Sequence, residues 1–235
     1  MLLSFIVPAH NEELELPATL RAIQRAADGH PFEIIVVDDS SVDRTIAIAQ
    51  EYGARVISIE RRHIAAARNA GARGARGDVF FFVDADTHIE SAHVTDALVA
   101  LQKGASGGSA WLRFDRAVPF WARLMFQIFS VLYFTSRLGA GAFLFTSRDK
   151  FFAAGGFDEQ FFAGEETYFS IALKKFGGFR ILRTPATTSA RKLRMHRPHY
   201  VLRRFLGIIF GGPRVLRSRK KLDLWYDGKR EETPV

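Results

Sequence analysis

Acidic side chains follow two apolar segments in the N-terminal half of the chain. Asp84 and Asp86, one residue apart, come directly after Val79–Val83, and Asp39 comes shortly after Ile34–Val37. Two neighbouring carboxylates repel each other, and a divalent cation shared with diphosphate oxygens would neutralise them. The alternative is a solvated turn or a helix cap, because Asp also accepts hydrogen bonds from unpaired backbone amides. The position of the pair directly after an apolar run favours a metal-assisted diphosphate site.

The segments that must position these acids alternate between two patterns. Apolar runs rich in β-branched and aromatic residues predict parallel strands buried on both faces, at Leu3–Val7, Ile34–Val37, Val56–Ile59 and Val79–Val83. Between them, residues 16–27, 46–49 and 65–72 show the apolar spacing of amphipathic helices. This alternation predicts an α/β fold, a Rossmann-like doubly wound and mainly parallel sheet with helices on both faces. Ligands bind beyond the carboxyl ends of such strands, where the acids lie.

The pattern loosens in the second half of the chain. We expect a helix in the aromatic stretch Phe120–Phe134, a short strand at Phe143–Thr146, a turn at Gly155 and Gly156, and a helix from about Glu165 to Lys175. Phe120–Phe134 is too short to span a membrane and has one polar face. It therefore predicts an amphipathic helix, packed either on the core or at a membrane interface. No linker separates these segments, so we expect additions to the same sheet.

Several short motifs occur in a fixed order along the chain. They are Pro8-Ala9-His10-Asn11-Glu12, Val37-Asp38-Asp39-Ser40-Ser41-Val42-Asp43-Arg44-Thr45, Ala67-Arg68-Asn69-Ala70-Gly71, Asp84-Ala85-Asp86, Gly155-Gly156-Phe157-Asp158-Glu159 and Gly164-Glu165-Glu166. In order and approximate spacing, over roughly residues 3–182, they resemble those of family 2 glycosyltransferases. The resemblance implies a GT-A fold, a nucleotide-sugar donor and a transfer that usually inverts the anomeric carbon.

The resemblance also implies roles for individual residues. The loop residues Pro8, Ala9, His10, Asn11 and Glu12, together with Asp39, would contact the base and ribose. Arg68 would face the nucleotide or diphosphate, with a surface ion pair as the alternative. Asp84 would approach the ribose or a metal-bound water. Asp86 would coordinate the metal, either Mg²⁺ or Mn²⁺.

The acid pair Glu165-Glu166 stands where the family usually has Glu-Asp, with the second acid as general base. The resemblance therefore selects Glu166 as the base. Successive helical residues point about 100° apart, so only one of the two can normally face the reacting hydroxyl. We expect Glu165 to matter less for turnover. Asp158 is a further candidate, either to orient the acceptor or to cap a turn.

Composition bounds the cofactors and partners. The chain has no cysteine, so any metal must be held by oxygen or imidazole ligands. Of a net charge of +8, residues 191–221 carry eleven Lys and Arg and no acid, interleaved with apolar side chains. This basic segment favours an anionic membrane surface or the phosphate of a lipid-linked acceptor. A solvated basic helix is the alternative, and nucleic acid is less favoured because no binding module is recognisable.

These observations lead to a division of the chain and a set of function hypotheses. We expect a GT-A domain in residues 1–190, with a donor half (1–110) and an acceptor half (111–190), and a basic extension in residues 191–235. The chain starts in an apolar strand without a basic leader, which predicts a cytoplasmic protein, and the basic segment favours a peripheral position at the cytoplasmic face of a membrane. His196 lies where relatives place a third metal ligand, but basic neighbours favour a surface histidine. The rivals to an inverting glycosyltransferase are a nucleotidyltransferase and a catalytically silent sugar-nucleotide or membrane-binding protein.

Overall fold

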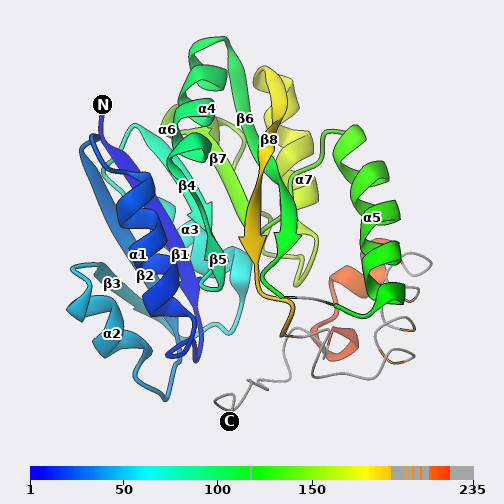
Figure 1. Cartoon of the computed structure of the whole chain (residues 1–235), viewed down its shortest axis with the longest axis horizontal. Helices are drawn as coiled ribbons and strands as arrows, with labels where there is room; N and C mark the ends of the chain where they lie inside the picture. The colour runs from blue at the N-terminus through cyan, green and yellow to red at the C-terminus, as the bar shows by residue number, and fades with distance from the viewer. Residues whose placement is uncertain (117, 192–199, 201–202, 204–206, 208–211, 223–235) are drawn as a thin grey trace.

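The computed structural model describes residues 1–116, 118–191, 200, 203, 207 and 212–222. Its strands are β1 (Leu3–Ala9), β2 (Phe32–Asp39), β3 (Arg55–Ile59), β4 (Val79–Val83), β5 (Thr87–His88), β6 (Ala105–Phe114), β7 (Phe143–Ser147) and β8 (Gly178–Thr188). In the described part of the chain they form one eight-stranded sheet in the order β3-β2-β1-β4-β7-β6-β8-β5. Figure 1 shows this sheet crossing the whole molecule.

The first four strands form the parallel part of the sheet. β1 pairs in parallel with β2 and β4, and β2 pairs in parallel with β3. All four predicted apolar runs are therefore confirmed as strands. Their carboxyl ends meet at one edge, at the bottom of Figure 1, and this edge carries Asp39 and the Asp84–Asp86 pair.

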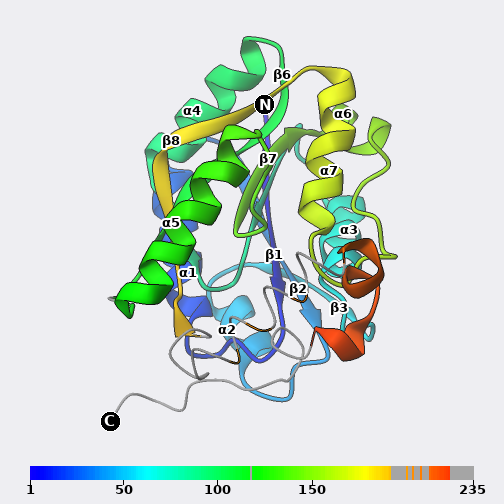
Figure 2. The same ribbon diagram turned by 90° about the vertical axis from the view of Figure 1, so that its right-hand side faces the viewer.

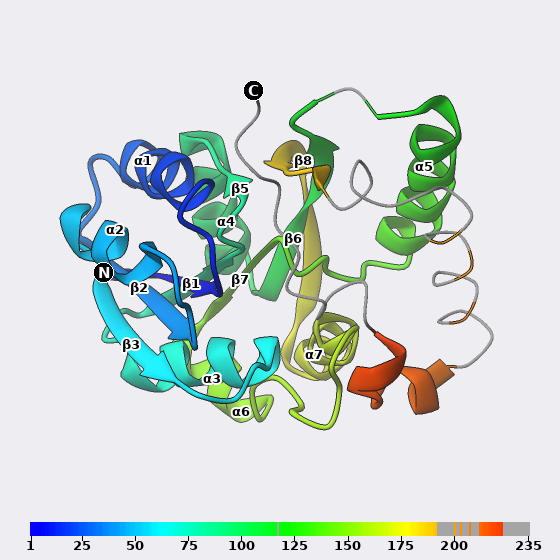
Figure 3. The same ribbon diagram turned by 90° about the horizontal axis from the view of Figure 1, so that it is seen from below.

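Helices cover both faces of the sheet, as the alternation of patterns predicted. On one face lie α1 (Leu16–Ala26), α2 (Thr45–Glu51) and α4 (Ser91–Gln102), and on the other lie α3 (Ile64–Gly74), α6 (Arg148–Ala153) and α7 (Glu165–Leu173) (Figure 3). Side chains alternate between these faces along each strand. Phe5 and Val7 accordingly pack in the core under α1, whereas Ile6 packs in the core under α3.

The second half of the chain extends the same sheet, as expected. β7 pairs antiparallel with both β4 and β6, and β8 pairs in parallel with β6. The strand expected at Phe143–Thr146 is confirmed, but β6 and β8 had no clear sequence signal. In β6 the reason is local, because Gly107 and Gly108 lie against the backbones of neighbouring strands, where a Cβ atom would collide with carbonyl oxygens. Close strand contact here selects glycine, which a search for apolar runs does not detect.

The aromatic stretch forms α5 (Phe120–Thr135), which lies to one side of β6 and β8 (Figures 1 and 2). Its C-terminal end packs on the fold, because Phe134 is buried against Trp111 with ring centroids 4.8 Å apart. Its outer side exposes Phe120, Leu124 and Val131. Core packing is therefore confirmed for one end of the helix, and a membrane role for the uncovered apolar strip stays a prediction. Among the described helices, none is long and apolar enough to cross a bilayer.

Candidate active site

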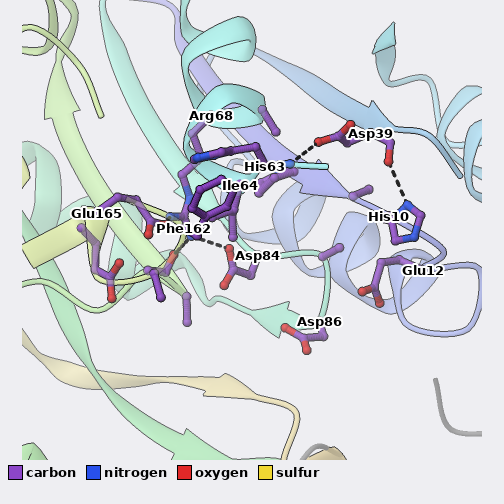
Figure 4. Close-up of a pocket in the computed structure, with 18 of the residues that line it drawn as sticks. His10, Glu12, Asp39, His63, Ile64, Arg68, Asp84, Asp86, Phe162 and Glu165 are labelled. Atoms are coloured by element: carbon purple, nitrogen blue, oxygen red, sulfur yellow. Dashed lines mark hydrogen bonds and ion pairs between the residues drawn. The ribbon is translucent and has the colours of Figure 1, made fainter. Parts of the chain in front are cut away.

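A cavity of about 380 Å³ opens where β1, β2 and β4 end. Its lining comes from both halves of the chain: Pro8, Ala9, His10, Glu12, Asp39, Arg62, His63, Ile64, Ala67, Arg68, Asp84, Ala85, Asp86, Gly141, Ala142, Phe162, Ala163, Gly164, Glu165, Glu166, Thr188 and Arg191. Figure 4 shows the strand-end acids on one side of this space and Glu165 on the other. The volume lies in the range of small-molecule sites. Most of the residues selected from the sequence therefore meet in one place.

Asp39 organises the wall nearest β2. Its carboxylate accepts hydrogen bonds from the backbone amides of Arg61, Arg62 and His63, at 2.7–2.8 Å. These bonds fix the segment that leads into α3. The backbone carbonyl of Asp39 accepts a hydrogen bond from Nδ1 of His10 at 2.8 Å (Figure 4). Asp39 is buried, and its bonds to backbone amides agree with the capping interpretation; its contact with a base or ribose stays a prediction.

Asn11 does not line the cavity. Its amide N–H donates to the hydroxyl of Ser41 at 2.9 Å, and its side-chain oxygen accepts from the amide of Val42 at 2.8 Å. Asn11 thus joins the loops that follow β1 and β2. Asn11 therefore supports this wall from behind and does not form part of its surface.

His63 and Phe162 are in contact at the N-terminus of α3. No sequence signal selected either residue. His63 is the N-cap of α3, accepting from the amide of Ala66, and its ring lies 4.5 Å from the ring of Phe162. Phe162 belongs to the loop before α7. The contact closes one side of the cavity between the first and second halves of the chain.

Arg68 lies at the centre of a buried ion-pair cluster. Its guanidinium donates to Asp84 at 2.8 Å, to Glu165 at 2.5 Å and to the carbonyl oxygen of Gly141 at 3.0 Å. The side chain is 1% exposed. Burial acts to lower the pKa of Arg68, but the two carboxylates outweigh it and the pKa is raised. The alternative of a surface ion pair is wrong, because Arg68 is buried between two acids. Arg68 lines the cavity, and its contact with a nucleotide or diphosphate stays a prediction.

The neighbours of Arg68 in its motif have packing roles. Asn69 donates to the carbonyl oxygen of Phe157 at 2.8 Å and accepts from the amide of the same residue at 2.9 Å. Gly71 lies so close to Ile6 and Val37 that a Cβ atom would overlap their side chains. The Ala67–Gly71 motif therefore holds α3 against β1 and ties it to the Gly155–Glu159 turn.

Asp86 is paired with an arginine from the far end of the chain. One oxygen of Asp86 lies 3.3 Å from the guanidinium of Arg191, which also binds Glu12 through two hydrogen bonds of 2.6 Å. Arg191 follows β8 and is the first residue of the segment predicted to be a basic extension. The sequence could not reveal this contact, because 179 residues separate Glu12 from Arg191.

These acids can hold a metal only with help from a ligand. Among the described residues, no group of three or more His, Asp and Glu side chains could enclose a cation. Asp84 and Asp86 each have one oxygen engaged by an arginine. Mg²⁺ is commonly bound by one or two carboxylates together with substrate phosphates and waters. The donor set therefore fits a cation that is bound jointly with a diphosphate.

The N-terminus of α7 presents the two adjacent glutamates differently. Gly164 precedes the helix with φ of 74°, a conformation that glycine adopts without strain. Glu165 is buried on Arg68, whereas Glu166 lines the cavity and forms no ion pair within the described part of the chain. Burial, and then the charge of Glu165, raise the pKa of Glu166 to about 8. Asp158 is exposed, accepts from the amide of Gln160 at 2.9 Å and lies outside the cavity lining.

Residues 212–222 lie beside this helix, drawn in red and orange below α7 in Figure 2. The carbonyl oxygen of Leu216 accepts from the amide of Phe162 at 2.8 Å, and Arg217 lies 4.8 Å from the ring of Phe161. This part of the basic segment therefore contacts the loop that carries Phe162. His196 lies outside the described residues.

The sheet order and the acids at its edge define a class of protein, the GT-A glycosyltransferases. A mannosyltransferase from Pyrobaculum calidifontis, solved with GDP-Man and Mn²⁺, superposes with a TM-score of 0.66 at 19% identity, covering 94% of this chain and 64% of that one. TarS residues 1–349 of S. aureus, solved with UDP, superpose with a TM-score of 0.64 at 18% identity, covering 97% and 70%. At these identities the comparison shows the shared fold.

The chain belongs to glycosyl transferase family 2, whose family model matches residues 4–158. This confirms the resemblance carried by the motifs. A 4,4'-diaponeurosporenoate glycosyltransferase of Staphylococcus haemolyticus is 34% identical over 104 residues, which are 41% of this chain and 27% of that protein. A dolichol-phosphate mannosyltransferase of Pyrococcus furiosus is 32% identical over 134 residues, which are 53% and 38%. The chain thus matches well under half of the length of these relatives.

Proposed function

We propose that this protein transfers a sugar from a nucleoside-diphosphate sugar to an acceptor hydroxyl, with inversion at the anomeric carbon. One observation carries the proposal: the cavity holds the Asp84–Asp86 pair on one side and Glu166, without an ion-pair partner among the described residues, on the other. Membership of family 2 favours sugar transfer over nucleotidyl transfer. The similar proteins, a 4,4'-diaponeurosporenoate glycosyltransferase and a dolichol-phosphate mannosyltransferase, support this class of reaction.

The donor is proposed to bind along the strand ends. Pro8, Ala9, His10 and the segment fixed by Asp39 offer a wall for the base and ribose. Asp86, with Asp84 beside it, would hold Mg²⁺ or Mn²⁺ together with the diphosphate. When bound, such a cation would neutralise charge on the departing nucleoside diphosphate.

Glu166 is proposed as the general base that takes the proton of the acceptor hydroxyl. Glu165 cannot serve while both it and Asp84 hold Arg68, so Glu166 is the available carboxylate at the start of α7. Because the pKa of Glu166 is raised to about 8, its proton must be lost before it can act. Turnover should therefore increase as the pH approaches 8 from below.

The acceptor is proposed to be lipid-linked, or a cell-envelope polysaccharide, and to be met at the cytoplasmic face of a membrane. The uncovered apolar strip of α5 and the eleven basic residues of the segment 191–221 support an anionic interface. Binding to anionic vesicles should weaken with salt, since charges are screened over about 10 Å at 0.1 M. Absence of binding at low salt would remove this part of the proposal and leave the transfer reaction untouched.

The first test is a thermal-shift screen of nucleoside diphosphates with and without Mn²⁺ or Mg²⁺. A ligand that binds only the folded state stabilises it in proportion to occupancy. Hydrolysis of the matching donor sugar in the absence of acceptor would then separate an enzyme from a silent binding protein. If a nucleotide stabilises the protein but no donor sugar is ever hydrolysed or transferred, the enzymatic proposal fails.

A further inference from the structure

Arg191 joins two residues of the donor wall that carry negative charge. Its two hydrogen bonds to Glu12 are both 2.6 Å long, whereas its contact with Asp86 is 3.3 Å. The side chain is 9% exposed, and it lines the same cavity as Asp84 and Asp86. Glu12 therefore anchors the guanidinium, and Asp86 is its looser partner.

This contact supplies positive charge to the Asp84–Asp86 pair without a metal. Neighbouring carboxylates need a positive counter-ion, and the sequence suggested a metal. In the structure Arg68 supplies the positive charge for Asp84 and Arg191 supplies it for Asp86. A cation that binds Asp86 directly must approach this guanidinium and is repelled by it. A bound diphosphate offsets this repulsion between the cation and Arg191, because its oxygens attract both positive charges.

The two arginines differ in how easily they can release their aspartate. Arg68 is held by two acids and a carbonyl oxygen at 2.5–3.0 Å. Arg191 can give up Asp86 and still keep both bonds to Glu12. The guanidinium nitrogen that lies 3.3 Å from Asp86 could then donate to an anion that enters the cavity.

We propose that Arg191 is the resident counter-ion of Asp86 in the donor-free protein and competes with a divalent cation for this carboxylate. The cation then binds tightly only together with a nucleoside diphosphate, whose oxygens accept the guanidinium's hydrogen bonds. This proposal rests on the proposed function, because it assumes that a nucleoside diphosphate and a cation bind at this edge of the sheet. In the donor complex Arg191 binds the diphosphate. Because it then releases Asp86, binding of the diphosphate strengthens binding of the metal.

The test measures Mn²⁺ binding without nucleotide, by the loss of the free-ion electron paramagnetic resonance signal. Arg191→Gln removes the competing charge, so it should bind Mn²⁺ alone more tightly than the wild type, on the order of 5- to 150-fold as for typical coupled sites. UDP and GDP, titrated in EDTA, should bind the same variant more weakly than the wild type. Arg44→Gln is the matched control, because Arg44 forms an exposed pair with Glu51 and is absent from the cavity lining.

Two further variants guard against a folding defect, since Arg191→Gln removes the positive charge that pairs with the buried carboxylate of Glu12. Arg191→Lys keeps the positive charge and should bind Mn²⁺ alone as weakly as the wild type. The double variant Glu12→Gln/Arg191→Gln removes both charges and should still bind Mn²⁺ alone more tightly than the wild type. Thermal unfolding of each variant establishes that the folded protein is being compared.

Several results would overturn the proposal. One is tight Mn²⁺ binding by the wild type without nucleotide. Another is no gain in Mn²⁺ affinity in Arg191→Gln and in the double variant, or an equal gain in Arg44→Gln. If these occur while the wild type binds UDP or GDP with Mn²⁺, the proposed function stands and only the role of Arg191 falls. If the wild type binds neither nucleotide with or without metal, both proposals fall.

Discussion

The carboxylates on the two sides of the cavity have opposite surroundings. At the strand ends, Asp39 accepts three backbone amides, Asp84 binds Arg68 and Asp86 contacts Arg191. At the start of α7, Glu166 lines the same cavity and has no ion-pair partner among the described residues, while its neighbour Glu165 is bound to Arg68. The acids at the strand ends are therefore held in place by hydrogen bonds and ion pairs. The acid of the acceptor side is kept in surroundings that favour its protonated form.

This contrast separates positioning from proton transfer. A carboxylate whose oxygens are bound by an arginine is held in one place and has fewer free lone pairs to offer a substrate hydroxyl. A partly buried carboxylate beside another acid has a raised pKa, which suits a general base that operates near neutral pH. Variants on the two sides should consequently fail in different ways, and the following measurements test that difference.

The largest expected effect is on turnover, in Glu166→Gln. Glutamine keeps the size and hydrogen bonding of the side chain but cannot accept the proton, so turnover should fall by about 10² to 10⁴ while nucleotide binding survives. Transfer rates and thermal shifts with nucleotide measure the two quantities separately. Glu165→Gln, compared at equal folded fraction, should reduce turnover less. If Glu165→Gln stops turnover and Glu166→Gln does not, the two roles are reversed.

On the donor side, Arg68→Met should mainly reduce stability. It leaves the buried Glu165 and the partly exposed Asp84 without their shared partner, and breaking a buried pair such as Arg68–Glu165 costs about 3–5 kcal/mol. For a chain of this length that corresponds to a fall in Tm of roughly 6–20 °C. Arg44→Met removes an exposed arginine of a surface pair and should cost at most about 1 kcal/mol. Equal Tm values for the two variants would show that the buried cluster does not stabilise the fold.

Asp86→Ala should remove the metal dependence of nucleotide binding. With nucleotide at about 100 times its dissociation constant, the wild type gains about 2.7 kcal/mol of stability. The part of this gain that needs Mn²⁺ or Mg²⁺ should disappear in the variant, because the carboxylate that would share the cation is gone. Thermal unfolding with nucleotide, with and without metal, gives the comparison. A full metal-dependent shift in Asp86→Ala would exclude Asp86 as the ligand.

A further expected effect is the pH dependence of stability at Glu166. The folded protein keeps the Glu166 proton up to about pH 8, whereas the unfolded chain loses it near 4.5, so this group lowers stability as the pH rises between these values. Glu166→Gln has no such proton. Its Tm relative to the wild type should rise between about pH 5 and pH 8, by roughly 2–4 °C for each kcal/mol recovered. Glu51→Gln, at an exposed glutamate, should show no such trend.

Local patterns were sufficient to predict much of the donor side. The four parallel strands, the helices between them and the acids at the strand ends follow from residues that are neighbours in the chain. Gly164 before the Glu165-Glu166 pair likewise predicted the start of α7. The glycine-bearing strand β6 and strand β8 were not predicted, because their stability comes from pairing with each other and not from an apolar run.

Which acid is neutralised by which arginine was decided by the tertiary structure alone. The sequence by itself established the family, the sheet edge that carries Asp39, Asp84 and Asp86, and the two glutamates that compete for the role of base. It could not place Arg68 on Glu165, 97 residues away, or Arg191 on Glu12, 179 residues away. The reason is that strand order, which brings α7 and the end of β8 to the edge formed by β1 and β4, is set by packing between distant segments. Local periodicity reports which face of an element is buried, not which distant side chain will lie opposite it.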